Sequence, residues 1–223
     1  IGNDANNPNH RIYQTTTRQE FHTDSCDIVA LLCLRQAKSG GQSSIVSSVT
    51  LFNEMMARRP DLAAILFEPL HIDRRGEVPA GEKPYYRIPV FNYFAGTLSS
   101  AYVRPYTESA RRFDDVPPLT DLQVEALDML DALAEDDDLR LVMDFQPGDI
   151  QYLHNTQIMH GRDDFEDWPE PERKRHLLRL WLCPADGRPL PDWFARRWGS
   201  TEIGNRGGIM VPGVKINVPL EPV

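Results

Sequence analysis

Short runs of apolar and β-branched residues, bounded by turns, recur along this chain and are its strongest constraint on fold. The run at residues 28–34 is followed by a Ser-Gly-Gly turn, and similar segments cover residues 139–145, 150–154 and 176–182. Prolines at positions 79, 84, 89, 105, 117 and 118 break up residues 70–118, which favours short strands and loops there. We therefore expect many short strands around one core.

Two segments show helical periodicity instead. Apolar residues at helical spacing begin near Ser48, and Pro60 must end or restart that helix. The capping-box sequence Thr-Asp-Leu-Gln at residues 120–123 opens a second helix, which the acidic residues 135–138 end. Short strands with two helices indicate a single, mainly β domain over residues 1–223, a double-stranded β-helix (jelly roll) with flanking helices.

Composition limits the classes of binding partner and the cellular compartment that we expect for this chain. A net charge of −9 and a pI of about 5.1 argue against binding to nucleic acid. No apolar run approaches the roughly 18 residues that span a bilayer, so we expect no membrane segment. The three cysteines lack a Cys-x-x-Cys spacing, which fits a reducing cytoplasm better than a disulfide framework. The chain starts at Ile1 without an initiator Met or a signal peptide, so we expect that an N-terminal segment is missing.

Two His-x-Asp motifs are candidates for metal binding. They are His22 with Asp24 and His71 with Asp73. On a strand, residues two apart project from one face, so either pair can offer an imidazole and a carboxylate together. A further histidine would complete the two-His, one-carboxylate triad that holds Fe(II) with three positions open. Chance supplies about one such motif in a chain with 6 His and 33 acidic residues, so the spacing alone does not choose between them.

Arg179 interrupts the apolar segment 177–182. Period-2 alternation places it on one face with Leu177 and Trp181. An unpaired guanidinium there would cost several kcal/mol, so we expect a partner carboxylate. That partner is either an Asp or Glu of this chain or a bound dicarboxylate such as 2-oxoglutarate, which arginine grips with two hydrogen bonds. The residues alone leave both alternatives open.

Several motifs occur in an order that is specific although each alone is weak. They are His-Thr-Asp at 22–24, Ser-Gly-Gly-Gln-Ser at 39–43, Pro-Gly-Asp-Ile at 147–150, the segment 155–160 ending in His160, Arg175 and Arg179. Over residues 13–182 the chain thereby resembles the taurine dioxygenase-like (TauD/TfdA) oxygenases that depend on Fe(II) and 2-oxoglutarate. Only the first His-x-Asp motif has the Gly-Gly-x-Ser segment at the expected distance after it.

The resemblance implies a role for six side chains. It implies that His22, Asp24 and His160 are the iron ligands. It also implies that Arg179 binds the distal carboxylate of 2-oxoglutarate with help from the Ser43 hydroxyl, and that Arg175 lies nearer the 1-carboxylate and the metal. His71 and Asp73 are then expected at a polar strand end.

The resemblance further implies an oxidoreductase. Its expected cofactors are Fe(II), 2-oxoglutarate as cosubstrate and dioxygen. It would oxidise, by default hydroxylate, a C–H bond of a small polar or anionic metabolite and release succinate and carbon dioxide. Relatives are often oligomers, which leaves a homo-oligomer open. Two other hypotheses are a cupin-like metal-dependent oxidase or isomerase that does not use 2-oxoglutarate, and a non-catalytic jelly-roll binding module.

Overall fold

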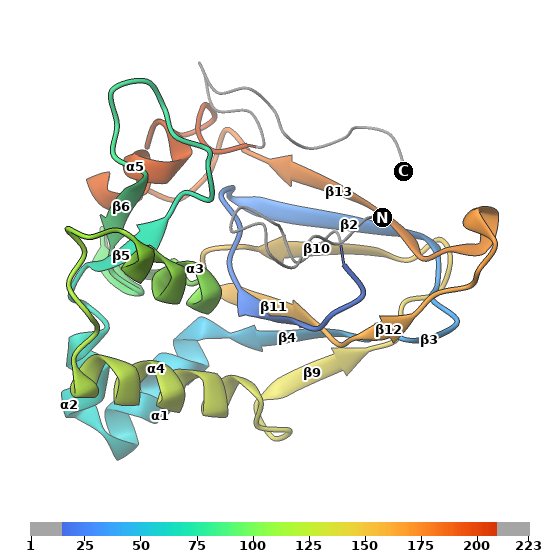
Figure 1. The fold of residues 1–223 in the computed structure, drawn as a ribbon, viewed down its shortest axis with the longest axis horizontal. Coiled ribbons are helices and arrows are strands. Elements are labelled where there is room, and N and C mark those ends of the chain that lie inside the picture. Colours follow the sequence, from blue (N-terminus) through green and yellow to red (C-terminus); the bar gives the residue numbers. More distant parts are fainter. Residues whose placement is uncertain (1–14, 209–223) are drawn as a thin grey trace.

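Two antiparallel sheets dominate the computed structural model, which describes residues 15–208 (Figure 1). The first sheet has the strand order β1 (Gln19–His22), β11 (Ile158–Arg162), β4 (Ser43–Ser47) and β9 (Arg140–Met143). The second has the order β10 (Ile150–His154), β2 (Ile28–Arg35) and β13 (His176–Leu182). Neighbouring strands in both sheets are far apart in sequence, as in a jelly roll.

The inner faces of the two sheets pack against each other. Val29 of β2 and Ile45 of β4 belong to one apolar cluster, together with Trp181 of β13. Strand β13 alternates, since Trp181 points into this cluster whereas Leu180 is 61% exposed on the outer face. The predicted jelly roll is confirmed, and its interior is the space in which the site lies.

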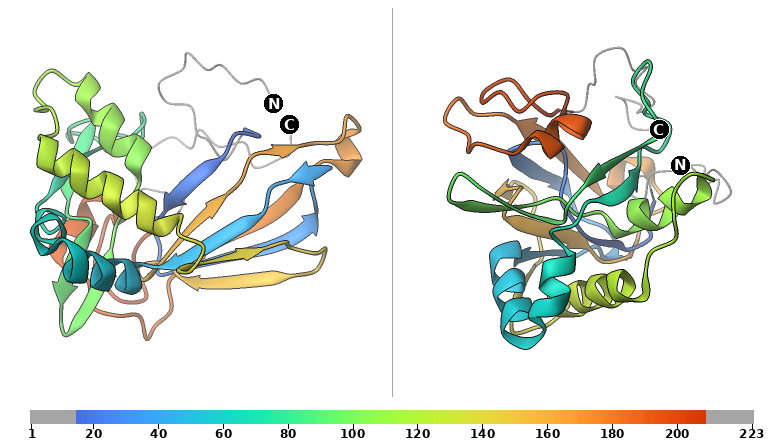
Figure 2. Two further views of the ribbon diagram at one scale, coloured as in Figure 1. Left: turned by 90° about the horizontal axis from the view of Figure 1, so that it is seen from below. Right: turned by 90° about the vertical axis from the view of Figure 1, so that its left-hand side faces the viewer.

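Helices α1 (Ser48–Arg58), α2 (Pro60–Ile65) and α4 (Asp121–Ala134) lie together at one end of the sheets (Figures 1 and 2). Pro60 occupies the first turn of α2, where its missing N–H breaks no helical hydrogen bond. The capping box of α4 is formed as predicted. The largest apolar cluster joins these helices to the first sheet through residues such as Leu127 and Met159.

The remaining elements are all short. They are the hairpins β5 (Leu70–Asp73) with β6 (Tyr85–Ile88) and β7 (Phe91–Phe94) with β8 (Thr97–Ser100), the short pair β3 (Ser39–Gly40) with β12 (Phe165–Glu166), helices α3 (Arg104–Ser109) and α5 (Ala195–Trp198), and the 3₁₀ turns η2 (Ala110–Arg112), η3 (Pro171–Arg173) and η4 (Asp192–Phe194). Helix α5 packs on β5 and β6 through a cluster that includes Trp198 and Tyr86.

The sequence prediction missed several elements. The prediction of two helices was wrong, because α2, α3 and α5 are short helices without a full amphipathic repeat. Strand β11 was also missed, since its five residues include a histidine, a glycine and an arginine. In the described part of the chain, no helix is both long enough and apolar enough to cross a bilayer.

Candidate active site

The three side chains predicted to bind a metal lie close together on the first sheet. His22 ends β1, Asp24 follows it, and His160 lies on β11 opposite His22 in the strand register. Asp24 Oδ1 is 3.9 Å from His22 Nε2, and Asp24 Oδ2 is 3.8 Å from His160 Nε2. Ligand atoms of the three residues all lie within 4.8 Å of one another, and no other such group of His, Cys, Asp or Glu occurs within residues 15–208.

The position of Asp24 comes from hydrogen bonds and not from strand alternation. The expectation that His22 and Asp24 share a strand was wrong, because β1 ends at His22. The Asn155 side chain, fully buried, accepts from the Asp24 amide (2.7 Å) and donates to the carbonyl oxygens of Asp24 (2.9 Å) and Cys26 (2.7 Å). Thr23 is held from the other side, since its amide donates to the Tyr102 carbonyl at 2.8 Å. Two segments distant in sequence thus clamp the ligand loop.

The protonation states suit metal binding. Burial lowers the pKa of His160 to about 3 and also lowers the pKa of His22, so both imidazoles are neutral at pH 7. Burial alone would raise the pKa of Asp24, but Arg179 and the two histidines outweigh it and hold the pKa well below its ordinary value. Two neutral imidazoles and one carboxylate are the states in which these groups donate electron pairs to a metal.

The orientation of the imidazoles also fits a metal ion. His22 Nδ1 lies 2.8 Å from the Glu20 carbonyl oxygen and donates to it, which leaves Nε2 as the atom with the lone pair; the Gln19 side-chain amide donates to that Nε2 at 3.0 Å. No hydrogen-bond partner within the described residues contacts the buried Nδ1 of His160. One carboxylate and two Nε2 atoms converging on one point match the donor set that binds Fe(II) and leaves positions open.

The carboxylate partner expected for Arg179 is Asp24 itself. Arg179 Nη1 is 3.2 Å from Asp24 Oδ2, and Trp181 Nε1 donates to the same oxygen at 2.8 Å. Alternation on β13 was therefore predicted correctly. The Trp181 indole thus orients the carboxylate of a candidate metal ligand.

Arg175 lies elsewhere than expected. A Cβ on Gly41 would come within 3.2 Å of Arg175 Nε, and the Arg175 guanidinium is 5.3 Å from the Phe165 ring. It makes no ion pair with any residue of the described range, and burial lowers its pKa. The expectation that Arg175 lies nearer the metal than Arg179 was wrong, because Arg179, four residues further along the chain, is the one that contacts Asp24.

Ser43 lies on the interior face of the first sheet. In the β4–β11 register Ser43 is opposite Arg162 and Ile45 is opposite His160, so all four side chains share one face. Ser43 is 7% exposed. Gly41, two residues before the start of β4, lies against the Arg175 side chain.

The second His-x-Asp motif has a structural role. Asp73 is fully buried, accepts from Ser109 Oγ at 2.8 Å and pairs with Arg112 at 3.0 Å. His71 packs against the Tyr85 ring. Neither residue joins the cluster of candidate ligands, as expected from the missing Gly-Gly-x-Ser segment.

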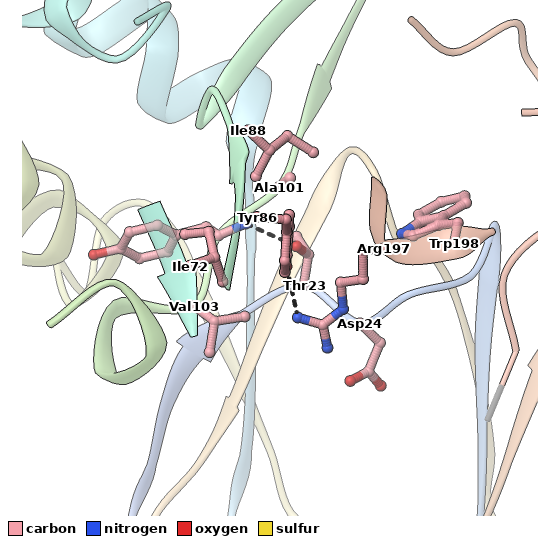
Figure 3. A pocket seen from close by; sticks show the side chains of 10 residues that line it. Thr23, Asp24, Ile72, Tyr86, Ile88, Ala101, Val103, Arg197 and Trp198 are labelled. Atoms are coloured by element: carbon pink, nitrogen blue, oxygen red, sulfur yellow. Dashed lines mark hydrogen bonds between the residues drawn. The ribbon is translucent and has the colours of Figure 1, made fainter. Parts of the chain in front are cut away.

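A pocket opens directly beside Asp24 (Figure 3). It lies between the ligand loop, the β5–β6 hairpin and α5. Its lining residues are Thr23, Asp24, Ile72, Tyr86, Ile88, Ala101, Tyr102, Val103, Arg197 and Trp198. The sequence analysis did not single out Arg197, since an Arg-Arg pair carries no signal for which of its members is buried.

The fold and the site define a class, the jelly-roll proteins with a two-His, one-carboxylate metal site between their sheets. The sequence matches the model of the Taurine catabolism dioxygenase TauD, TfdA family over residues 2–181. The chain belongs to that family.

Named relatives support this assignment. The chain is 35% identical over 195 residues to FR-33289 synthase of Streptomyces rubellomurinus, which covers 85% of this chain and 57% of that protein. It is 30% identical to a uridine-5'-phosphate dioxygenase of Amycolatopsis sp, covering 79% and 65% of the two chains. It is also 36% identical to the taurine hydroxylase-like protein SAT17 of Stachybotrys chartarum, covering 74% of this chain but 42% of that protein. The chain thus spans about half the length of FR-33289 synthase and of SAT17.

Solved structures share the fold. An asparagine oxygenase in complex with Fe(II), 2S,3S-3-hydroxyasparagine and succinate superposes with a TM-score of 0.57 at 20% identity, covering 77% of this chain and 55% of that one. The non-heme iron oxygenase OrfP in complex with Fe and alpha-ketoglutaric acid gives a TM-score of 0.52 at 16% identity, covering 75% and 50%.

Proposed function

We propose that this chain is the catalytic domain of a dioxygenase that uses Fe(II) and 2-oxoglutarate to hydroxylate a C–H bond of a small polar or anionic metabolite, with release of succinate and carbon dioxide. The convergence of His22, Asp24 and His160 within 4.8 Å carries this proposal. Bound Fe(II) would supply the redox chemistry with dioxygen that amino-acid side chains lack.

His22, Asp24 and His160 would hold the ion through two imidazoles and one carboxylate. The buried Asn155 fixes the Asp24 backbone, and Trp181 and Arg179 fix its carboxylate. The apolar cluster around Trp181 keeps the interior between the sheets dry, which strengthens each charged interaction within it.

The free cysteines Cys26, Cys33 and Cys183 fit a reducing compartment, and we place the enzyme in the cytoplasm on that ground.

The two arginines take roles opposite to those that the resemblance implies. Arg175 has no ion pair within the described residues and lies against Gly41, two residues before Ser43. We therefore assign the distal carboxylate of 2-oxoglutarate to Arg175 and Ser43. Arg179 contacts a metal ligand, so it belongs at the 1-carboxylate end.

Calorimetric titration of the Fe(II)-loaded protein with 2-oxoglutarate under anaerobic conditions tests this assignment. Arg175→Met should weaken 2-oxoglutarate binding about a hundredfold or more, because one guanidinium–carboxylate pair is lost from a buried site. Fe(II) affinity should change little, since Arg175 touches no ligand. Arg173→Met, which removes an exposed cation two residues away, is the matched control and should bind normally.

Other results would redirect the proposal. Normal 2-oxoglutarate binding in Arg175→Met, with loss in Arg179→Met, would restore the roles that the resemblance implies. Tight Fe(II) binding with no heat from 2-oxoglutarate would favour the cupin-like oxidase or isomerase. Absence of any Fe(II) binding would favour the non-catalytic binding module.

A further inference from the structure

Arg197 is a cation beside the metal ligands for which the proposed reaction has no use. Its Nε donates to Ser25 Oγ, and its Nη1 donates to the Tyr86 hydroxyl at 3.0 Å. Both partners are neutral, and Arg197 makes no ion pair with any residue between 15 and 208. A guanidinium has five N–H donors, so most of its donors have no partner there.

Arg74 is a second cation with poor compensation. It is 9% exposed, its guanidinium lies 5.1 Å from the centre of the Tyr86 ring, and its buried Nε has no hydrogen-bond partner in the described part of the chain. The Oε2 atom of Glu82 lies 3.6 Å from Arg74 Nη2, but the Glu82 side chain is half exposed to solvent. Arg74 stacks on the ring of the same Tyr86 whose hydroxyl accepts from Arg197, so both cations contact one side chain.

Burying the positive charges of Arg197 and Arg74 costs free energy unless an anion balances them. Asp24 is the acidic residue that lines the same pocket, but Arg179 and Trp181 already engage its carboxylate, and a bound metal ion would engage it further. Two incompletely paired guanidiniums in one buried region therefore point to a ligand that brings negative charge.

The positions of the lining residues indicate where the negative charge of such a ligand would lie. Figure 3 shows the Arg197 guanidinium between the Tyr86 hydroxyl and the Asp24 carboxylate. The rest of the wall is largely apolar and includes Ile72 and Ile88. A molecule with an anionic end at Arg197 and an aliphatic body would thus have its C–H bonds beside the metal ligands.

We propose that Arg197, supported by Arg74 across the Tyr86 ring, is the subsite for an oxyanion group of the substrate. The substrate class is a small aliphatic metabolite that carries a phosphonate, phosphate, sulfonate or carboxylate. This inference rests on the proposed function, because it takes the neighbouring His-Asp-His cluster to be the reaction centre.

The test is anaerobic calorimetry on the protein loaded first with Fe(II) and then with 2-oxoglutarate. Four probes of similar length are titrated in turn: propylphosphonate, propanesulfonate, butyrate and the uncharged butyramide. We expect at least one of the anions to bind and butyramide to bind at least tenfold more weakly. The order among the anions identifies the substrate's charged group.

Variants then assign the binding to the subsite. Arg197→Met should weaken the best anion at least tenfold, and Arg197→Lys should weaken it less because the charge remains. Arg196→Met removes the same charge from the same helix at an exposed position and should bind like the parent. Thermal unfolding checks each variant, and if Arg197→Met does not fold, Arg74→Met decides the question with an expected loss of several-fold.

The outcomes separate this inference from the proposed function. If 2-oxoglutarate gives no heat with the Fe(II)-loaded protein, the proposed function fails at the first step, whereas the anion titrations can still be read. Normal 2-oxoglutarate binding with no anion binding, or with equal anion affinity in the parent and Arg197→Met, would overturn the subsite alone.

Discussion

At the scale of single residues, the candidate ligand Asp24 is held in place by two neighbours, Asn155 and Trp181. His22, Asp24 and His160 are residue types with few uses in a dry interior, so a motif search finds them. Asn155 and Trp181 are ordinary buried residues by composition, and their contacts with Asp24 depend on the tertiary fold. The contact between Arg179 and Asp24 also depends on the tertiary fold, because period-2 counting gives the face of a strand and not a distance to another segment.

Asn155 offers a direct test of positioning. Asn155→Ala deletes three buried hydrogen bonds to the ligand loop, and we expect it to lower the free energy of unfolding by about 2–4 kcal/mol. It should also weaken Fe(II) binding by roughly 10- to 100-fold, as expected for a group that orients a ligand. Denaturant unfolding and Fe(II) titration measure the two effects.

The exposed Asn205 provides the control for that variant. Its side chain bonds only to Glu202 within the described residues, so Asn205→Ala should leave both quantities near those of the parent. Unchanged Fe(II) affinity in a folded Asn155→Ala protein would show that the clamp does not position Asp24.

At the scale of elements, prediction succeeded where the signal is local. The strands β10 and β13 have the predicted bounds, and α4 begins with the predicted capping box. Strand β11 carries a ligand but was missed, because its pairing with β1 and β4 joins residues more than a hundred positions apart. Long-range pairing of this kind leaves no periodic trace in a five-residue segment.

The capping box should contribute measurably to stability. Thr120 Oγ1 accepts from the Gln123 amide at 3.2 Å, and Gln123 Oε1 accepts from the Thr120 amide at 3.0 Å. Thr120→Ala removes the first bond, so the free energy of unfolding should fall by about 1 kcal/mol in denaturant titrations. Thr120→Ser keeps the hydroxyl and should retain most of that stability; an equal loss in both variants would mean that the cap is not the cause.

Helix α4 also carries a pH-dependent contact. Burial raises the pKa of Asp131 to about 6, although the Tyr102 hydroxyl donates to it and Arg104 pairs with it at 3.1 Å. Between pH 4 and 6 the unfolded chain loses this proton before the folded chain does, so the contribution of Asp131 to stability falls as pH rises through that window.

The corresponding experiment compares the parent with Asp131→Asn. Because the Asp131 side chain is 37% exposed, we expect the parent to lose only about 1 kcal/mol relative to the variant between pH 4 and 7. Denaturant unfolding at both pH values measures that difference. Parallel pH profiles for the two proteins would contradict the raised pKa.

At the scale of the whole molecule, the site exists only because distant segments meet. The ligand loop near residue 24 follows the first strand, His160 lies on the eleventh strand, and Arg179 lies on the thirteenth in the opposite sheet. Alternation and turns predict a jelly roll, but they do not specify which strand ends adjoin. The order of motifs indicated that the three candidate ligands lie together, whereas only the structure shows that Arg197 lies beside them.

Whether this interior holds Fe(II) and 2-oxoglutarate together is decided by an anaerobic titration of the protein with Fe(II) and then with 2-oxoglutarate. We expect a weak visible charge-transfer band that saturates near one equivalent of each and that is absent in His160→Ala and Asp24→Ala. In Arg175→Met the band should appear only at much higher 2-oxoglutarate concentrations. Iron binding without the band, or a band of full intensity in His160→Ala, would contradict the account.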